Sequence, residues 1–297
     1  MRSDIETIIK LIGHTPTIQL EENLYAKIEA KNPAGSIKDR VAAYMIKDGI
    51  SRGILKDGSR VAEATSGNTG IGLAYISKQM GFSCDIYMPE SMSLMRRELI
   101  RQYGANVILT KADEGMAGSV REAKQSLDKN TYFADQFNNP ISVTAHYETT
   151  AKEIFSDKVY DYVVCGIGTG GTIMGIKKYI EDNKLYTKVV GIEPAESPLI
   201  TQNKAGKHKI EGIGANFTPS ILDVSKIDIM KTVAGDNAVS AVTYIFEKYG
   251  LKCGISSGAA YLVAKEIKEL TGKSVLAIFP DDGNRYSDSL YRSCSWV

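Results

Sequence analysis

The chain has 297 residues, of which 43% are hydrophobic and 24% charged, which excludes a disordered protein and suits one large α/β unit or two lobes. Its 36 Lys and Arg residues balance 35 Asp and Glu residues to a net charge of +1, so the sequence gives no electrostatic footprint for nucleic acid or for an anionic membrane. Any anion-binding site must therefore be local, made by a loop or by the start of a helix.

Short apolar runs alternate along the chain with longer runs of helical periodicity. The predicted strands span residues 23–29, 59–64, 83–88, 106–110, 161–168, 188–194 and 274–280. The predicted helices span residues 39–53, 70–81, 93–104, 117–128, 149–157, 171–183, 237–250 and 257–272. This alternation predicts an α/β fold of mostly parallel sheets covered by helices, and the continuously apolar strands predict that both faces of each sheet are buried.

The alternation pauses between residues 132 and 149, which predicts a boundary between two lobes. We place an N-terminal lobe at residues 1–145 and a C-terminal lobe at residues 146–297. The first strand, near residues 15–30, is a candidate to pair with the other lobe. A ligand is expected in the cleft where two α/β lobes meet.

The four cysteines and the N-terminal sequence indicate the cellular compartment in which the protein is expected. The cysteines are Cys84, Cys165, Cys253 and Cys294. They have no C-x-x-C spacing and no neighbouring His, so we predict no metal site, and the first three are expected to be small buried thiols. The N-terminal residues carry acids and lack an apolar signal core, and no apolar stretch reaches membrane-spanning length. We therefore expect a cytoplasmic protein.

A tight turn precedes the first long helix. Pro33, Gly35 and Ser36 lie directly before the helical pattern, which places Lys38 at its start. The positive end of a helix dipole disfavours a cation, so a lysine here favours a functional explanation over an ordinary surface role. Partial burial at such a position lowers the pKa of an amine, and the neutral amine is the form that condenses with an aldehyde.

A polar hexamer, Thr65–Gly70, joins the predicted strand 59–64 to the helix that follows. It offers backbone N–H groups, hydroxyls and an amide at a strand-to-helix turn, which is typical of an anion site. It has no lysine in a P-loop position, so a nucleoside triphosphate is not indicated, and a substrate carboxylate has the right size. A simple N-cap would explain one hydroxyl but not the whole hexamer.

A glycine-rich turn, Gly166–Thr172, follows the predicted strand 161–168 and opens another helix. Gly166, Gly168 and Gly171 match G-x-G-x-x-G, and Glu193 ends the next strand, so a dinucleotide site is one interpretation. The same turn can also hold a single phosphate monoester. Both interpretations predict a phosphate at this turn.

A fourth strand-to-helix turn spans residues 254–260, where Ser256 or Ser257 is a candidate helix cap. Taken in order, the four turns resemble the cysteine synthase family of pyridoxal 5′-phosphate (PLP) enzymes, which includes O-acetylserine sulfhydrylase and the core of cystathionine β-synthase. Further matching segments are residues 12–16, 88–90, 136–140, 146–150, 212–214 and 280–283. The likeness covers nearly the full chain.

The resemblance implies a tryptophan synthase β-like fold with PLP between two lobes, and it implies roles for particular residues. Lys38 resembles the Schiff-base lysine that also moves the α-proton. The cofactor-binding residues implied are Lys38, Asn68, Gly168, Thr169, Gly170, Gly171, Thr172 and Ser256, with Ser256 at the pyridine nitrogen. The substrate-binding residues implied are Thr65, Ser66, Asn68, Thr69, Gln136, Gly212 and Asn216.

The reaction implied is β-replacement or β-elimination on a serine- or cysteine-type amino acid, through an aminoacrylate and then attack of sulfide or a thiol at Cβ. A hydroxyl at the pyridine nitrogen makes the ring a weaker electron sink, which favours prompt loss of the β-substituent. The resemblance also implies a homodimer, and we expect neither nucleic acid nor membrane as partner.

One departure bears on the substrate. Asn216 stands where O-acetylserine sulfhydrylases usually have glycine and cystathionine β-synthases have aspartate. It can contact an amino-acid nucleophile or be a solvated loop residue. An enzyme that consumes cysteine or serine to form lanthionine or cystathionine, with release of hydrogen sulfide from cysteine, is therefore an alternative. A nicotinamide-dependent oxidoreductase and a non-catalytic amino-acid sensor are more distant alternatives.

Overall fold

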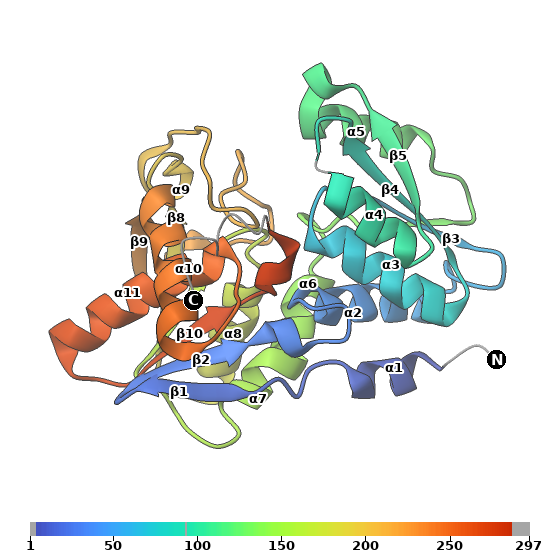
Figure 1. Ribbon diagram of the computed structural model, residues 1–297. Coiled ribbons are helices and arrows are strands. Elements are labelled where there is room, and N and C mark those ends of the chain that lie inside the picture. Colours follow the sequence, from blue (N-terminus) through green and yellow to red (C-terminus); the bar gives the residue numbers. More distant parts are fainter. Residues whose placement is uncertain (1–3, 93, 287–297) are drawn as a thin grey trace. The chain divides into compact units, whose positions relative to one another are not determined.

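The computed structural model describes residues 4–92 and 94–286 (Figure 1). The described chain divides into two compact units. The first unit contains the residues up to Gly13 together with Asn32–Ala145. The second unit contains His14–Lys31 together with the residues from His146 onward. Residues 14–31 carry two strands, so the beginning of the chain contributes to both units.

The first unit is built on a four-stranded, wholly parallel sheet in the order β5-β4-β3-β6. Its strands are β3 (Arg60–Ala64), β4 (Ser83–Pro89), β5 (Asn106–Thr110) and β6 (Thr131–Phe133). Its helices are α1 (Ile5–Leu11), α2 (Lys38–Ser51), α3 (Asn68–Met80), α4 (Leu94–Gln102), α5 (Gly115–Gln125) and α6 (Ile141–Ala145), with a 3₁₀ turn at Ala112–Glu114.

Successive side chains of the central strands enter different layers of this unit. Val61 and Ile86 pack in the layer formed with α1, α2 and α3, whereas Ala62 and Tyr87 pack with Ala123 of α5. Because side chains alternate between the faces of a strand, burial on both sides produces the continuous apolar runs of the sequence. The parallel, helix-covered sheet predicted from those runs is confirmed.

The second unit contains a six-stranded sheet in the order β1-β2-β10-β7-β8-β9, in which only the β1–β2 pair is antiparallel among the described strands. Its strands are β1 (Thr17–Glu21), β2 (Leu24–Ile28), β7 (Tyr162–Gly166), β8 (Lys188–Pro194), β9 (Ile229–Val233) and β10 (Val275–Phe279). Its helices are α7 (Lys152–Ile154), α8 (Gly171–Asp182), α9 (Leu199–Gln202), α10 (Gly235–Tyr249) and α11 (Ile255–Thr271).

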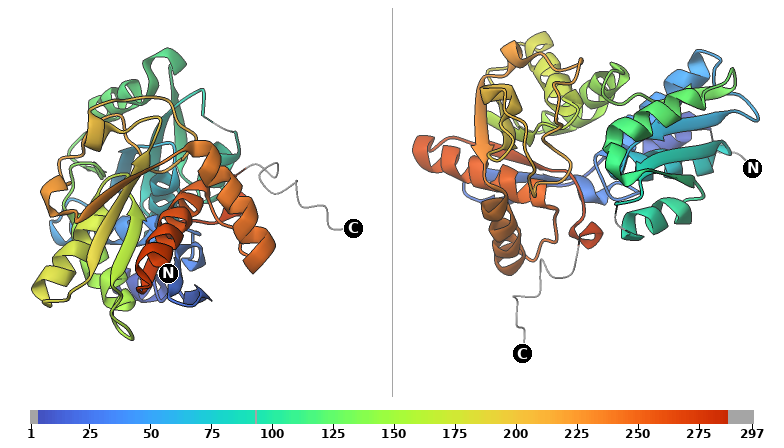
Figure 2. Two further views of the ribbon diagram at one scale, coloured as in Figure 1. Left: turned by 90° about the vertical axis from the view of Figure 1, so that its left-hand side faces the viewer. Right: turned by 90° about the horizontal axis from the view of Figure 1, so that it is seen from above.

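Short turns complete this unit: 3₁₀ turns span Glu29–Lys31, Val224–Lys226 and Gly283–Arg285, and a π-helix spans His146–Ala151. Helices α10 and α11 pack against each other, and α11 lies on β7 and β10 (Figure 2). Their apolar faces form one core with the sheet, to which Val164, Ile192 and Phe279 contribute.

Every predicted strand and long helix has a counterpart within a few residues of its expected bounds, except in the segment 149–157. There the structure has the π-helix and the short α7 in place of one regular helix. The expected burial of Cys84, Cys165 and Cys253 as free thiols is confirmed. Cys294 lies outside the described residues.

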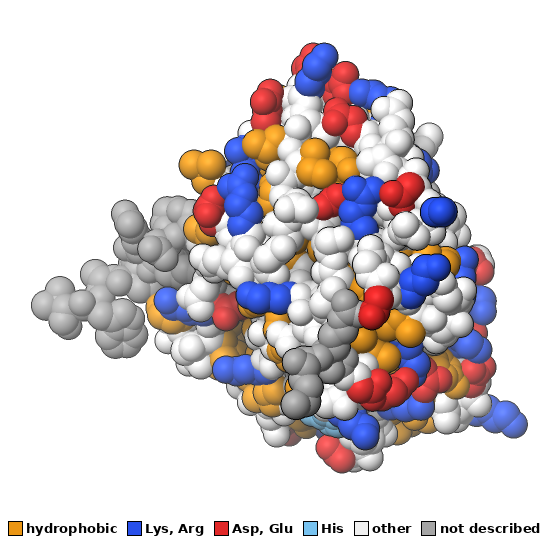
Figure 3. All heavy atoms as spheres, turned by 90° about the vertical axis from the view of Figure 1, so that its right-hand side faces the viewer, with side chains coloured by type: hydrophobic (Ala, Val, Ile, Leu, Met, Phe, Trp, Pro, Cys, Tyr) orange, Lys and Arg blue, Asp and Glu red, His pale blue; other side chains and the backbone are white. Residues whose placement is uncertain are grey.

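Basic and acidic side chains are interspersed over the face drawn in Figure 3, as the balanced composition suggests. Among residues 4–92 and 94–286, no helix is long and apolar enough to cross a membrane.

Candidate active site

Lys38 is the first residue of α2, where the sequence placed it. The preceding turn is held by its own polar groups. The Asp39 carboxylate accepts a hydrogen bond from the Ala34 amide at 2.6 Å, and the Lys38 amide donates to Ser36 Oγ at 3.3 Å. Gly35 has φ +83°, a conformation that favours glycine. The start of α2 is therefore a rigid support for the lysine side chain.

The surroundings of Lys38 change the pKa of its amine. Burial lowers its pKa from 10.5 to about 8, and the nearby Glu63 carboxyl group acts in the opposite direction. A pKa near 8 makes the neutral amine about 300-fold more abundant at pH 7 than it is for a free lysine. The structure thus favours the chemical form that attacks an aldehyde.

The loop Thr65–Gly67 lies between β3 and α3, at the carboxyl edge of the sheet of the first unit. Helix α3 packs tightly on the first turn of α2. A Cβ added at Gly72 would lie only 3.1 Å from the Lys38 carbonyl oxygen. The loop and the lysine are thereby placed at the starts of two helices in direct contact. In the described part of the chain, the amides of Ser66 and Thr69 donate no hydrogen bond within the protein. They are available to an anion.

Gln136 is brought to this loop from the segment after β6. Its side-chain Oε1 accepts a hydrogen bond from the Thr69 hydroxyl at 2.6 Å. Strands β3 and β6 are parallel neighbours, so the residues that follow them lie at the same edge of the sheet. The structure therefore brings together Lys38, the Thr65–Thr69 loop and Gln136 within one unit.

Two residues near this group were not identified from the sequence. Arg96, on α4, donates a hydrogen bond to the Ser66 carbonyl at 3.2 Å, and nothing in the sequence pointed to it. Glu63 lies on β3 with 2% of its surface exposed. It is the only acid of the predicted strand 59–64, and an acid in a strand expected to be buried was a usable signal.

The glycine-rich turn of the second unit joins β7 to α8, and Gly170 has φ +89°. The Gly171 amide donates to Thr169 Oγ1 at 3.4 Å. Within the described residues, the amides of Gly168, Thr169, Gly170 and Thr172 have no hydrogen-bond acceptor in the protein. A helix start with four free donors is suited to a phosphate group.

Gly168 is required sterically at this turn. A Cβ added there would lie 2.5 Å from the carbonyl oxygen of Gly212, which is closer than real Cβ contacts. Gly212 itself has φ +87° and is exposed. The close approach to the Gly212 carbonyl requires glycine at position 168, and the positive φ favours glycine at position 212.

A buried histidine supports the same turn from the π-helix. His146 is 1% exposed, and its Nε2 and the Thr172 hydroxyl are 3.2 Å apart. Its Nδ1 lies 2.9 Å from Thr150 Oγ1. One imidazole therefore contacts the hydroxyls of Thr150 and Thr172. His146 thus fixes the orientation of Thr172.

Ser256 is the second residue of α11 and is 4% exposed. The N-cap of α11 is Gly254, and no side chain caps this helix, so the expectation that Ser256 or Ser257 is the cap was wrong. Gly254 donates a backbone hydrogen bond to Asp281, just after β10. Strands β10 and β7 are parallel, so Ser256 and the glycine-rich turn lie at the same edge of the sheet.

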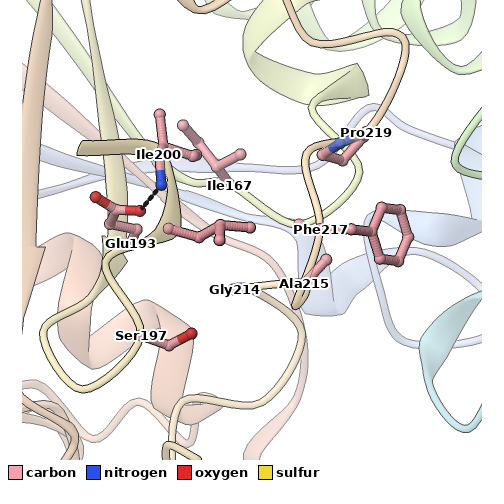
Figure 4. Close-up of a pocket in the computed structure, with 10 residues that line it drawn as sticks. Ile167, Glu193, Ser197, Ile200, Gly214, Ala215, Phe217 and Pro219 are labelled. Atoms are coloured by element: carbon pink, nitrogen blue, oxygen red, sulfur yellow. Dashed lines mark hydrogen bonds between the residues drawn. The ribbon is translucent and has the colours of Figure 1, made fainter. Parts of the chain in front are cut away.

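Glu193, the acid of the dinucleotide interpretation, has another role. Its carboxylate is 1% exposed and accepts hydrogen bonds from the amides of Ile200 (2.7 Å) and Thr201 (3.0 Å) and from the Thr201 hydroxyl (2.5 Å). Figure 4 shows it joined to Ile200 at the start of α9. A carboxylate that caps a helix from within the protein is not free for a ribose, so the dinucleotide interpretation loses its acidic partner.

The segment around Asn216 borders a small pocket within the second unit. Gly214, Ala215, Phe217 and Pro219 line this pocket together with Ile167 (Figure 4). Asn216 is not among the lining residues and is exposed.

These groups fit PLP in chemical terms. An amine with a lowered pKa can bond the aldehyde, free amides at a helix start can hold the phosphate, and the Ser256 hydroxyl can meet the ring nitrogen. Residues 8–281 match the family model described as "Pyridoxal-phosphate dependent enzyme". The chain belongs to this family, and its cofactor is PLP.

Comparison with individual proteins narrows the class. The chain is 39% identical to cysteine synthase A of Escherichia coli (strain K12) over 295 residues, covering 93% of this chain and 91% of that protein. The crystal structure of cysteine synthase from Entamoeba histolytica superposes with a TM-score of 0.91 at 34% identity, covering 98% and 91%. A hydrogen sulfide-producing enzyme from Fusobacterium nucleatum gives a TM-score of 0.89 at 37% identity, covering 96% and 91%.

Proposed function

We propose that this enzyme replaces the β-substituent of a serine-type amino acid, with O-acetylserine and sulfide as the principal pair. The observation that carries the proposal is the buried Lys38 amine, whose pKa is about 8, at a helix start packed against the Thr65–Thr69 loop. The Lys38 amine would hold the cofactor aldehyde, with which the amino group of an α-amino acid reacts, and the loop offers an anion site for its carboxylate. The likeness to cysteine synthases supports the choice of donor and nucleophile.

Separate groups of residues would bind the cofactor and the substrate. Bound PLP supplies an aldehyde and an electron-withdrawing ring. Lys38 would hold the cofactor by its aldehyde, and once the substrate's amino group takes its place, the Lys38 amine would accept the substrate's α-proton. The substrate carboxylate would be bound by Thr65, Ser66, Asn68, Thr69 and Gln136, and Asn68 would also contact the cofactor's ring oxygen. The phosphate would be held by Gly168, Thr169, Gly170, Gly171 and Thr172, and Ser256 would hydrogen-bond the ring nitrogen.

A substrate panel tests the reaction. The PLP-loaded enzyme is incubated with O-acetylserine, serine or cysteine, each with and without sulfide, and the products are identified by mass. We expect cysteine from O-acetylserine and sulfide at the highest kcat/KM, because acetate is a better leaving group than hydroxide. An enzyme that binds PLP but converts none of the three donors would contradict the proposal.

The release of hydrogen sulfide from cysteine is a second candidate function, favoured by the likeness to the hydrogen sulfide-producing enzyme. Lanthionine or cystathionine is then the product when an amino-acid thiol is the nucleophile. In the same panel, this function predicts sulfide from cysteine alone and a thioether product when a second thiol amino acid is added.

Asn216 distinguishes the two functions. Its exposed side-chain amide, in the Gly214–Phe217 segment, can hydrogen-bond an amino-acid nucleophile, whereas sulfide does not require this contact. Asn216→Gly removes one hydrogen bond to the amino-acid thiol and is therefore expected to lower kcat/KM for that nucleophile about tenfold. The kcat/KM for sulfide should stay within about twofold of the wild type. Competition kinetics with both nucleophiles measure the ratio. An unchanged ratio would assign Asn216 to the solvated surface.

The resemblance also supports a homodimeric assembly and a cytoplasmic location, which we include in the proposal, with a small-molecule substrate and no nucleic acid as partner.

A further inference from the structure

Glu63 is a buried acid that has no role in the proposed reaction. Its side chain is 2% exposed, and its carboxyl oxygens accept hydrogen bonds from the amides of Ala64 at 2.8 Å and Gln136 at 3.1 Å. A buried carboxyl group without a structural need costs stability, and a valine or alanine would satisfy the same strand. The contacts of Glu63 indicate a functional reason for a buried acid at this position.

The hydrogen bonds form a chain from Glu63 to the substrate loop. Glu63 holds the backbone of Gln136, and Gln136 Oε1 in turn accepts the Thr69 hydroxyl at 2.6 Å. Asp135, which precedes Gln136, has φ +46°, so the backbone here adopts a conformation that needs support. The Glu63 carboxyl group supplies that support from the neighbouring strand.

We infer that Glu63 is a positioning residue that fixes Gln136, and through it Thr69, in the geometry that binds the substrate carboxylate. The inference rests on the proposed function, because it assigns a carboxylate to the Thr65–Thr69 loop. Glu63 itself touches neither substrate nor cofactor in this role.

Glu63 also interacts electrostatically with other titratable side chains of the unit. Burial raises the pKa of Glu63 to about 8, and Asp135 raises it further, while the two amides and Lys38 lower it. The thiol of Cys84, on β4, also senses Glu63, and burial keeps it protonated by raising its pKa to about 12. Glu63 raises the pKa of Lys38 in return.

The test uses the PLP-loaded full chain and L-alanine, which has the amine and carboxylate of a substrate but no leaving group. Glu63→Gln keeps the shape of the side chain but replaces one acceptor oxygen with an amide nitrogen that can only donate. We expect the Kd of L-alanine, from the absorbance change on titration, to rise about tenfold. The affinity for PLP should change less than twofold, because the phosphate turn belongs to the other unit.

A double-mutant cycle separates positioning from a general loss of structure. Gln136→Ala alone should weaken L-alanine about tenfold, and adding Glu63→Gln should weaken it little further, since the residue to be positioned is gone. Additive losses would overturn the inference. Asp85→Asn is the matched control: Asp85 is a buried acid of the same sheet that pairs with Arg60 at 2.9 Å, and its loss should leave L-alanine binding unchanged.

The balance of KM against kcat gives a readout that a merely structural role would not move. In Glu63→Gln, KM for O-acetylserine should rise about tenfold while kcat stays within about twofold, because only the binding of the substrate carboxylate is weakened. If Glu63→Gln does not fold, Glu63→Asp makes the comparison, with weaker L-alanine binding and an unchanged kcat. Wild-type L-alanine binding in either Glu63 variant would refute the inference, whereas wild-type protein that binds no amino acid would refute the proposed function instead.

Discussion

Lys38→Ala is expected to abolish the yellow colour of the PLP-loaded enzyme and to lower kcat/KM for β-replacement by about 10³-fold or more. The variant lacks the amine that bonds the cofactor aldehyde and that takes the α-proton, and general-base catalysis alone contributes about 10²–10⁴-fold. Absorbance spectra and initial rates measure the two losses. Colour and activity that both persist would exclude Lys38 as the cofactor-binding lysine.

Stability provides the control for folding in this experiment. The pKa of Lys38 is lower in the folded state, about 8, than the 10.5 of an unfolded lysine, so the unfolded state binds the proton more tightly between these values. The buried amine therefore destabilises the fold below pH 8, and this penalty disappears as the pH rises toward 10.5. Lys38→Ala apoprotein should unfold at neutral pH no more easily than the wild type. Lys31→Ala, at an exposed lysine, should keep both colour and activity.

Gly168→Ala is expected to weaken PLP binding about 100-fold, as two charge-assisted hydrogen bonds to phosphate would. The added methyl group would lie 2.5 Å from the Gly212 carbonyl oxygen, so the turn must shift and its free amides lose their alignment. Overpacking of this kind also costs about 1–3 kcal/mol of unfolding free energy. Titration of the apoprotein with PLP measures the first effect and denaturant unfolding the second.

Gly67→Ala is the matched comparison. A methyl group at Gly67 meets no atom within 4 Å, and its φ of −129° is open to any residue. PLP affinity should therefore remain within about twofold of the wild type, since a backbone conformation that tolerates alanine is preserved. Stabilisation of the apoprotein by inorganic phosphate should persist in Gly67→Ala and be lost in Gly168→Ala. Equal PLP affinities in the two variants would contradict a phosphate site at the glycine-rich turn.

The strands that sequence reasoning missed share a position in the fold. β1, β6 and β9 each form an edge of a sheet. An edge strand packs against fewer neighbours, so its apolar residues are fewer and less continuous: β1 contains no fully buried residue, and β6 has only three residues. Sequence periodicity detects burial, and it therefore detects central strands best.

The sequence by itself determined the α/β class, the buried central strands and the local turns at Lys38, Thr65–Gly70 and Gly166–Thr172, because each of these depends on residues adjacent along the chain. Only the tertiary structure decided which residues support those turns. Gln136 meets Thr69 across 67 positions, Glu63 holds Gln136 across 73, and His146 reaches Thr172 from a π-helix. Such contacts follow from the parallel pairing of strands and the packing of helices on them, and no local pattern encodes a partner so far away in the chain.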